Sequence, residues 1–129
     1  MPLLAVIVGA LVGGALRLGL DALIPHGDAD FPWSTLLINV AGAFALALLV
    51  ARVWPVAPEW LRAGLGTGLL GSFTTFSALA VAMVSLVEAD AWGPAIGYLA
   101  VTMTAGLLAA WGGLALGFRR TTPVIEADE

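Results

Sequence analysis

The sequence of 129 residues contains no cysteine, which excludes disulfide bonds and thiolate metal sites. It is also poor in charge: only 11% of its residues are charged, against about a quarter in an average soluble domain. Apolar residues instead make up 60% of the chain, and its mean hydropathy is +1.01. A soluble domain of this size keeps a large share of its surface exposed and could not hide so much apolar surface. The composition therefore predicts a protein that lies in a lipid bilayer.

Basic residues are missing from the beginning of the chain. Since no cation precedes Arg17, the opening apolar stretch lacks the basic start of a cleaved signal peptide, and we predict that it is a retained span. The net charge of −4 argues against nucleic acid as a partner.

Four stretches reach the length of about 20 apolar residues that a bilayer-crossing helix needs. They cover residues 3–23, 33–53, 60–87 and 92–118, and the breaks between them are rich in Pro, Gly and acidic residues. Four of the tryptophans lie at the ends of these stretches, where amphipathic rings favour the headgroup level: Trp33, Trp54, Trp60 and Trp92. We therefore predict an all-α membrane protein with one four-helix transmembrane domain over residues 1–129 and a disordered tail at 119–129.

The charges outside the spans are distributed unevenly. Arginines flank the second connection and follow the fourth span, whereas the first and third connections carry Asp and Glu but no Lys or Arg. The arginines are Arg52, Arg62, Arg119 and Arg120, and the acids are Asp28, Asp30, Glu88 and Asp90. With four spans, the second connection and both termini share one side, which the positive-inside rule assigns to the cytoplasm. The sequence thus predicts a multi-pass protein of the cell membrane with both termini cytoplasmic.

Two polar side chains lie within the first two predicted spans. An arginine at the bilayer centre costs at least about 2.5 kcal/mol, so Arg17 either snorkels to the nearby interface or faces protein or a water-filled vestibule. In a vestibule its charge would attract anions. Asn39 needs hydrogen-bond partners in lipid. It either joins two helices or lines a pore, where its NH2 group can solvate an anion.

Glycine and hydroxyl-bearing residues interrupt the middle of the third span, in the stretch GLLGSFTTFSAL at residues 68–79. Glycine beside β-branched threonine weakens a helix, and hydroxyls compete for its backbone groups. We therefore predict a break, which would free carbonyl oxygens that membranes tolerate only where protein or an ion satisfies them. The stretch indicates either an ion-related site or polar packing. In the fourth span, Tyr98 and Thr102 share a helix face, which indicates a hydroxyl track or a packing stripe.

Acidic residues are absent from the middle of every span, since Asp21 and Glu88 lie at span ends. A proton-coupled exporter generally needs an embedded carboxylate. The alternative function, a small proton-coupled multidrug-type exporter, is therefore disfavoured, and a non-transporting membrane subunit is a third interpretation. Glycines at four-residue spacing predict close helix packing in a tight bundle: Gly9 and Gly13, Gly64 and Gly68, Gly93 and Gly97, and Gly113 and Gly117.

Three motifs, in this order, resemble those of the Fluc/CrcB family of fluoride channels. They are GGALR at 13–17, STLLINVAGAF at 34–44 and GSFTTFS at 71–77. The resemblance covers essentially the whole chain. It implies a passive fluoride-specific channel, not an enzyme, that exports fluoride from the cytoplasm and so lowers its toxicity. It also implies an antiparallel dimer with two pores near the subunit interface.

The resemblance further implies roles for individual residues. Asn39 would donate to fluoride, and Phe76 would line the pore with its electropositive ring edge. The polar pore lining would include Thr75, Ser77, Tyr98 and Thr102, and Arg17 would lie near a vestibule. Backbone carbonyls of Gly71 and Thr74, from both subunits, would hold a structural Na⁺ that is not transported.

The chain departs from the family pattern in three ways. The family commonly reads TTFSTF, whereas this chain reads TTFSAL and has Leu79 where a second pore phenylalanine is expected. The usual Gly-Gly before the threonines is here Gly71-Ser72. The arginine bias is also strong for a chain that must insert in both orientations to form an antiparallel homodimer. Our hypothesis is therefore a heterodimer with an oppositely oriented homologue, which would supply the missing aromatic ring.

Overall fold

The computed structural model describes residues 1–25, 27 and 30–119, and its regular elements are all helical. The elements in chain order are α1 (Pro2–Leu23), α2 (Trp33–Arg52), α3 (Glu59–Arg62), the π-helix η1 (Ala63–Leu70), α4 (Gly71–Phe73), α5 (Phe76–Glu88) and α6 (Trp92–Phe118). Within this part of the chain, four helical stretches are long and apolar enough to cross a membrane, the third running over Glu59–Glu88. The predicted all-α class with four transmembrane helices is confirmed.

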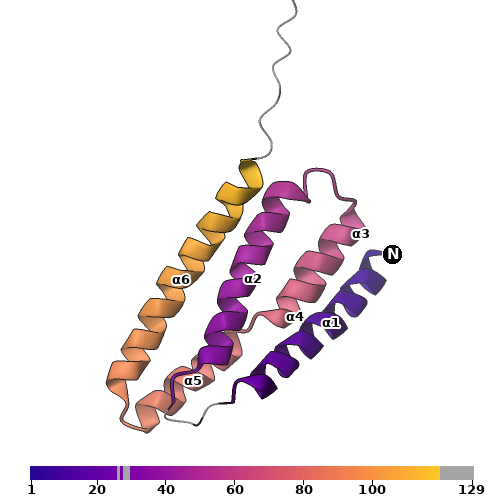
Figure 1. Cartoon of the computed structure of the whole chain (residues 1–129). Helices are drawn as coiled ribbons and strands as arrows, with labels where there is room; N and C mark the ends of the chain where they lie inside the picture. The colour runs from indigo at the N-terminus through magenta and orange to yellow at the C-terminus, as the bar shows by residue number, and fades with distance from the viewer. Residues whose placement is uncertain (26, 28–29, 120–129) are drawn as a thin grey trace, which may run out of the picture.

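The four spans run alternately up and down (Figure 1). The connection between α1 and α2 lies at the same end as the turn between α5 and α6, and the connection between α2 and α3 lies at the opposite end. Arg52, Arg62 and Arg119 are therefore at one end, and Asp30 and Glu88 at the other. Arg119 caps the C-terminus of α6. The rest of the tail predicted to be disordered, residues 120–129, lies outside the described residues, as do Asp28 and Arg120.

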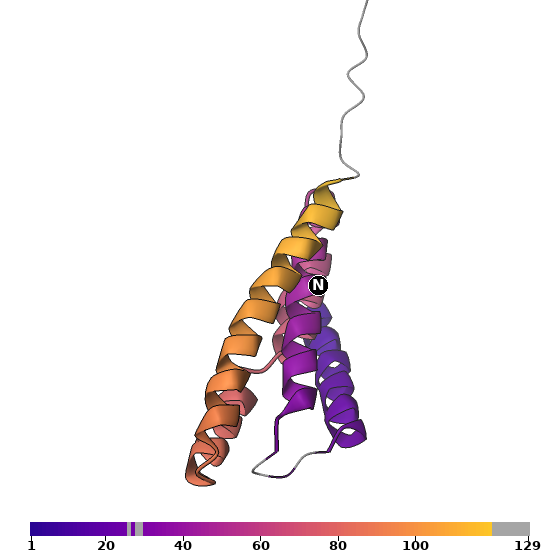
Figure 2. The same ribbon diagram turned by 60° about the vertical axis from the view of Figure 1, so that its left-hand side comes forward.

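Close packing is concentrated in two helix pairs, α1 with η1 and α2 with α6 (Figure 2). Glycines let the backbones approach: a Cβ added to Gly68 would lie 2.6 Å from the Val6 carbonyl oxygen, and one added to Gly113 would lie 2.5 Å from the Phe44 carbonyl oxygen. A Cβ at Gly93 or Gly97 would meet no atom within 4 Å, so this predicted pair makes no close contact among the described residues.

The third span is broken near its middle, as predicted. Thr74 and Thr75 have extended backbones, with ψ of 155° and 119°, and they separate α4 from α5. The hydroxyl of Thr75 then caps α5 by accepting a hydrogen bond from the Ala78 N–H at 3.1 Å. Before the break, the span is wound as a π-helix, a form found mainly in short stretches and often at functional sites.

A small cluster of buried apolar residues lies where α5, α6 and the start of α2 meet. It consists of Leu36, Leu79, Leu86, Ala95 and Tyr98. Most large apolar side chains on α1 and α6 are exposed instead, including Leu3, Leu11 and Leu107. Because lipid is as apolar as these side chains, a membrane protein does not need to bury them.

Candidate functional site

The break in the third span is held by a side chain from α2. The Nδ2 of Asn39 donates to the Thr75 carbonyl oxygen at 3.0 Å, and the Thr75 N–H donates to Oδ1 of Asn39 at 2.8 Å. The amide thus pairs with both backbone groups of Thr75, as a neighbouring strand would. A side-chain amide nitrogen carries two N–H groups, so the bond to Thr75 uses one and leaves a second donor.

At the break, two backbone N–H groups donate to side chains and not to the carbonyls that they would bond in a continuous helix. In such a helix, Thr75 N–H would donate to the Gly71 carbonyl and Ala78 N–H to the Thr74 carbonyl. Here they donate to Asn39 and to the Thr75 hydroxyl. The carbonyls of Gly71 and Thr74 are therefore released from their helical partners. They are the two carbonyls that the resemblance to the Fluc/CrcB family assigns to a cation, and carbonyl oxygen is a suitable ligand for a hard cation such as Na⁺.

An open pocket of about 260 Å³ lies on the α6 side of the break. It is lined by Asn39, Thr75, Phe76, Leu79 and Thr102, among others. Phe76 is 79% exposed, so its ring projects away from the rest of the chain. Thr102 is buried, and so is Leu79, which belongs to the core. Four of the predicted pore residues therefore surround one pocket.

Tyr98 lies one helical turn from Thr102 and does not line this pocket. It is fully buried, and its ring meets that of Phe31 edge to face, with the ring centroids 5.4 Å apart. The Tyr98 and Thr102 side chains are neighbours on one face of α6. Neither makes a hydrogen bond of normal geometry with any described residue. Tyr98 and Thr102 thus lie one turn apart on α6, and only Thr102 reaches the pocket.

A second pocket, of about 280 Å³, lies on the α1 side of the break. Its lining includes Arg17, Asp21, Thr75 and Ser77. The hydroxyls of Thr75 and Ser77 are 3.2 Å apart and hydrogen bonded. Because Thr75 lines both pockets, it lies between them, while Ser77 and Phe76 face opposite sides. Arg17, which the resemblance places near a vestibule, is half-buried beside this pocket.

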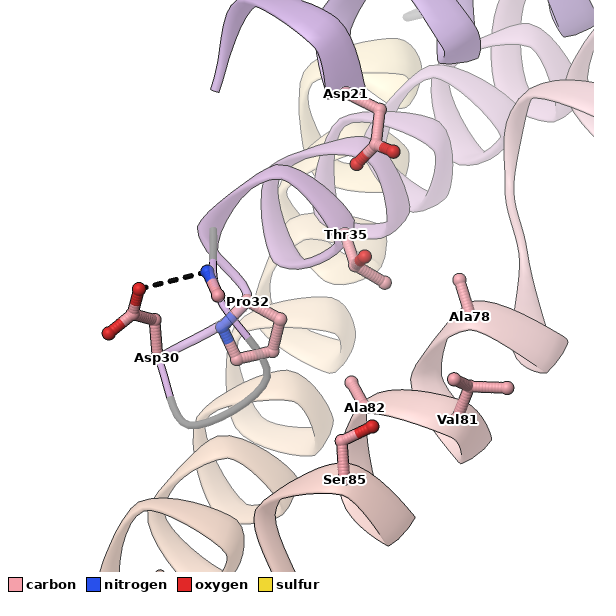
Figure 3. A pocket seen from close by; sticks show the side chains of 9 residues that line it. Asp21, Asp30, Pro32, Thr35, Ala78, Val81, Ala82 and Ser85 are labelled. Atoms are coloured by element: carbon pink, nitrogen blue, oxygen red, sulfur yellow. Dashed lines mark hydrogen bonds between the residues drawn. The ribbon is translucent and has the colours of Figure 1, made fainter. Parts of the chain in front are cut away.

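A third pocket, of about 190 Å³, continues this space toward the connection between α1 and α2. It shares Asp21, Thr35, Ala78 and Val81 with the second pocket. Figure 3 shows Thr35 on α2 across from Ala78 and Val81 on α5, with Asp21 above them. Asp30 lines the outer part of this pocket and accepts a hydrogen bond from the Gly27 N–H at 2.9 Å.

Sequence reasoning missed two polar contacts that join α1 to other spans. The hydroxyl of Ser34 donates to Oδ1 of Asp21 at 2.6 Å, joining α2 to α1. The hydroxyl of Ser72 donates to the Ala10 carbonyl of α1 at 2.9 Å, as well as to its own helix. The i, i+4 spacing of Arg17 and Asp21 was a visible signal that these two residues share a face. The partners in α2 and α1 were not visible, because they depend on how the helices pack.

The sequence is similar to a known family and to several named proteins over most of its length. The family model described as "CrcB-like protein, Camphor Resistance (CrcB)" matches residues 4–114. The fluoride-specific ion channel FluC 2 of Geobacillus kaustophilus is 39% identical over 118 residues, which cover 89% of this chain and 92% of the relative. The fluoride-specific ion channel FluC of Rhodospirillum centenum is 40% identical over 119 residues, covering 88% and 93%. FluC 1 of Mycobacterium bovis is 40% identical over 109 residues, or 83% of each chain.

Proposed function

Because this chain belongs to the CrcB family of membrane proteins, we propose that it is a fluoride channel that lets fluoride leave the cell passively. The observation that carries the proposal is the similarity to fluoride-specific ion channels over most of the chain, with Asn39, Phe76 and Thr102 around one pocket. Fluoride enters from acidic surroundings as neutral HF and is trapped as the anion at cytoplasmic pH. A selective leak driven by the inside-negative potential then expels it. A channel catalyses no reaction, so the protein is not an enzyme.

The polar groups around the break suit a small anion that binds briefly and then passes through the channel. The hydroxyls of Thr75, Ser77 and Thr102 and the second N–H of Asn39 are neutral donors. Neutral donors can replace the hydration shell of an anion without holding it by charge, and conduction requires sites that an ion can leave. The edge of the Phe76 ring is electropositive as well. This lining favours a channel over the proton-coupled exporter, which would need a carboxylate beside the substrate.

A second subunit would complete the pore. Phe76 is 79% exposed and its pocket is open, so one chain leaves its pore lining at the surface. The polar groups of Asn39, Thr75 and Thr102 line the same open pocket, and polar groups are better placed against a partner than against lipid tails. We assign the partner to the opposite orientation, since two inverted copies give the inverted-repeat architecture that larger transporters build into one chain.

The released carbonyls of Gly71 and Thr74 support a structural Na⁺ between such subunits. Gly71 is exposed, and a Cβ there would meet only the Gly66 carbonyl oxygen, at 3.6 Å, so the backbone is open to a partner. Four carbonyls, two from each subunit, would hold the ion. When bound, Na⁺ would satisfy carbonyl oxygens that the break frees.

The charge distribution favours one orientation and therefore a heterodimer. Arg52, Arg62 and Arg119 lie at one end of the bundle, which the positive-inside rule places in the cytoplasm together with both termini. An oppositely oriented partner would then be a homologue with the reverse bias. Leu79 is buried in the core and supplies no ring to the pocket, so the partner would supply the second aromatic.

Fluoride efflux from liposomes tests the function. The purified chain is reconstituted alone, valinomycin clamps the membrane potential, a fluoride electrode reports release, and chloride is the control ion. Rapid fluoride release with chloride retained would establish the channel and, for the chain alone, overturn the heterodimer. If the chain alone is silent, the assay is repeated with the closest homologue from the same genome. Silence in both assays would contradict fluoride conduction.

The sodium site is tested in the same assay. Replacing Na⁺ by the bulky cation N-methyl-D-glucamine on both sides should abolish efflux and lower the thermal stability of the purified channel, and returning Na⁺ should restore both. K⁺ serves as a control for ion size. Full conduction and unchanged stability after exhaustive removal of Na⁺ would contradict a structural role for the ion.

A further inference from the structure

Ser72 stands where the family pattern has glycine, and its hydroxyl joins two spans. It follows Gly71 in α4, the three-residue helix that ends at the break. The side chain is half-buried, and its hydroxyl donates to the Ala10 carbonyl of α1 at 2.9 Å. The carbonyl oxygens of Gly68 and Leu69, in the same span, lie 2.9 and 3.2 Å from the hydroxyl oxygen. The hydroxyl therefore adds a link to α1 that a glycine at this position could not make.

The facing surface of α1 leaves room for this hydroxyl. Ala10 and Gly13 are three residues apart and share one side of α1, and α4 packs beside them (Figure 1). A Cβ at Gly13 would overlap the Ser72 hydroxyl. The bare backbone of Gly13 thus provides the space in which Ser72 reaches Ala10.

The link between Ser72 and α1 bears on the carbonyl group of Gly71. This carbonyl and the N–H of Ser72 belong to one planar peptide unit, so fixing the residue on one side of the unit limits how the oxygen can turn. In a continuous helix the oxygen would accept from the Thr75 N–H, which here donates to Asn39 at 2.8 Å. The direction of the Gly71 oxygen therefore depends on how Ser72 is held.

The second released carbonyl is anchored in the same manner but from another helix. The carbonyl of Thr74 shares its peptide unit with the Thr75 N–H, which Oδ1 of Asn39 on α2 accepts. The Gly71 carbonyl is thus anchored through α1 and the Thr74 carbonyl through α2. A cation that both oxygens bind needs them at a fixed separation, and groups that orient metal ligands are worth roughly 10- to 100-fold in metal affinity.

We propose that Ser72 is a positioning residue for the structural Na⁺: by joining α4 to α1, it directs the Gly71 carbonyl toward the ion and raises the affinity for Na⁺. The inference rests on the proposed Na⁺ site and assigns a role there to a side chain that does not itself touch the ion. When Ser72 loses its hydroxyl, the Gly71 carbonyl is still present but is free to turn, and Na⁺ is held less tightly.

Binding of radioactive sodium to the purified channel, measured by equilibrium dialysis, tests the role of Ser72. N-methyl-D-glucamine replaces Na⁺ so that the ionic strength stays constant. Ser72→Ala removes the hydroxyl, keeps a good helix former and should raise the dissociation constant for Na⁺ about tenfold. Thermal unfolding at saturating Na⁺ shows that the variant is folded.

Gly113→Ala is the matched control for a general loss of stability. A Cβ at Gly113 would lie 2.5 Å from the Phe44 carbonyl oxygen, so this variant should loosen the packing of α6 on α2. It leaves the contact between α4 and α1 unchanged. Its unfolding temperature should fall, whereas its dissociation constant for Na⁺ should stay within about twofold of the parent value.

A second pair of variants approaches the same contact from α1. Gly13→Ala pushes against the Ser72 hydroxyl and should also raise the dissociation constant for Na⁺. A Cβ at Gly14 would meet nothing within 4 Å, so Gly14→Ala should leave Na⁺ binding unchanged.

Equal dissociation constants for the parent chain and Ser72→Ala would overturn this inference while the Na⁺ site itself stands. An equal rise in Gly113→Ala would overturn it as well, since general loosening of the bundle would then be the cause. If the parent channel binds no Na⁺, the proposed Na⁺ site and this inference fail together. Fluoride efflux from liposomes is a separate measurement and decides the channel function independently.

Discussion

At the residue scale, Asn39 has a role that decides how the site is built. Its amide could have joined two helices or lined a pore, and the structure shows that it binds both backbone groups of Thr75. The two interpretations are compatible, because one N–H remains after the bond to Thr75. A single side chain can therefore stabilise the break and offer a donor at the pocket beside it.

Replacing Asn39 by Ala should destabilise the folded channel by about 1–3 kcal/mol, because the N–H and C=O of Thr75 lose their partner away from water. Thermal unfolding of the purified protein in detergent measures this effect. Ser77→Ala is the control, since among the described residues its hydroxyl bonds only the Thr75 hydroxyl, and the variant leaves no backbone group there unpaired. An Asn39→Ala variant that unfolds at the parent temperature would show that water or lipid headgroups replace the amide without cost.

Phe76 is expected to matter for conduction and not for folding. Because 79% of the side chain is exposed, Phe76→Leu should leave the stability of the single chain nearly unchanged. It removes the electropositive ring edge from the pocket, and fluoride efflux should fall by roughly tenfold, equivalent to about 1.4 kcal/mol. Phe44→Leu is the matched control, since Phe44 lines none of the three pockets around the break. Equal efflux from the two variants would contradict the proposed role of Phe76 in the pore lining.

At the element scale, the broken third span depends on the helix that supports it. Its first half packs against α1 through glycines, and Ser72 anchors α4 to the Ala10 carbonyl of α1. Its second half packs on α6 around Leu79, Leu86 and Tyr98. The break therefore lies between two halves that are held mainly by different neighbours, α1 for the first half and α6 for the second.

Two adjacent glycines of α1 provide a test of this support. A Cβ at Gly13 would overlap the Leu69 carbonyl oxygen and the Ser72 hydroxyl, whereas a Cβ at Gly14 would meet nothing within 4 Å. Gly13→Ala should destabilise the protein by about 1–3 kcal/mol through overpacking. Gly14→Ala should be neutral or slightly stabilising, because alanine has the higher helix propensity. Thermal unfolding of both variants in detergent measures the difference, and similar destabilisation in both would contradict close packing at Gly13.

At the scale of the whole molecule, charge divides the bundle into two unlike ends. Arg52, Arg62 and Arg119 mark one end, and Asp30 and Glu88 belong to the other. Most of the outer surface between these ends is apolar, and the pocket beside Phe76 opens onto it. The proposed orientation and the proposed pore surface together describe the partner subunit that we propose.

The orientation can be measured directly because the chain has no cysteine. Single Ala57→Cys and Ala89→Cys variants place a thiol at the arginine-rich end and at the opposite end, respectively. In intact cells that express this chain alone, a membrane-impermeant maleimide should label Ala89→Cys and spare Ala57→Cys. Adding Arg52→Gln and Arg62→Gln should raise labelling at position 57. Comparable labelling at both positions in the parent background would remove the basis for the heterodimer.

The sequence by itself determined that this protein lies in a lipid bilayer, how many spans it has and where the third span breaks. These follow from hydropathy, from the bilayer thickness and from the weak helix propensity of glycine beside β-branched residues, which are local properties. Only the tertiary structure decided that Asn39 binds Thr75, that Ser77 and Phe76 face different pockets, that Leu79 is buried, and that Asp21 is held by Ser34. Such pairings depend on how closely whole helices approach at their glycines, and that distance is a property of the packed bundle that no short stretch of sequence contains.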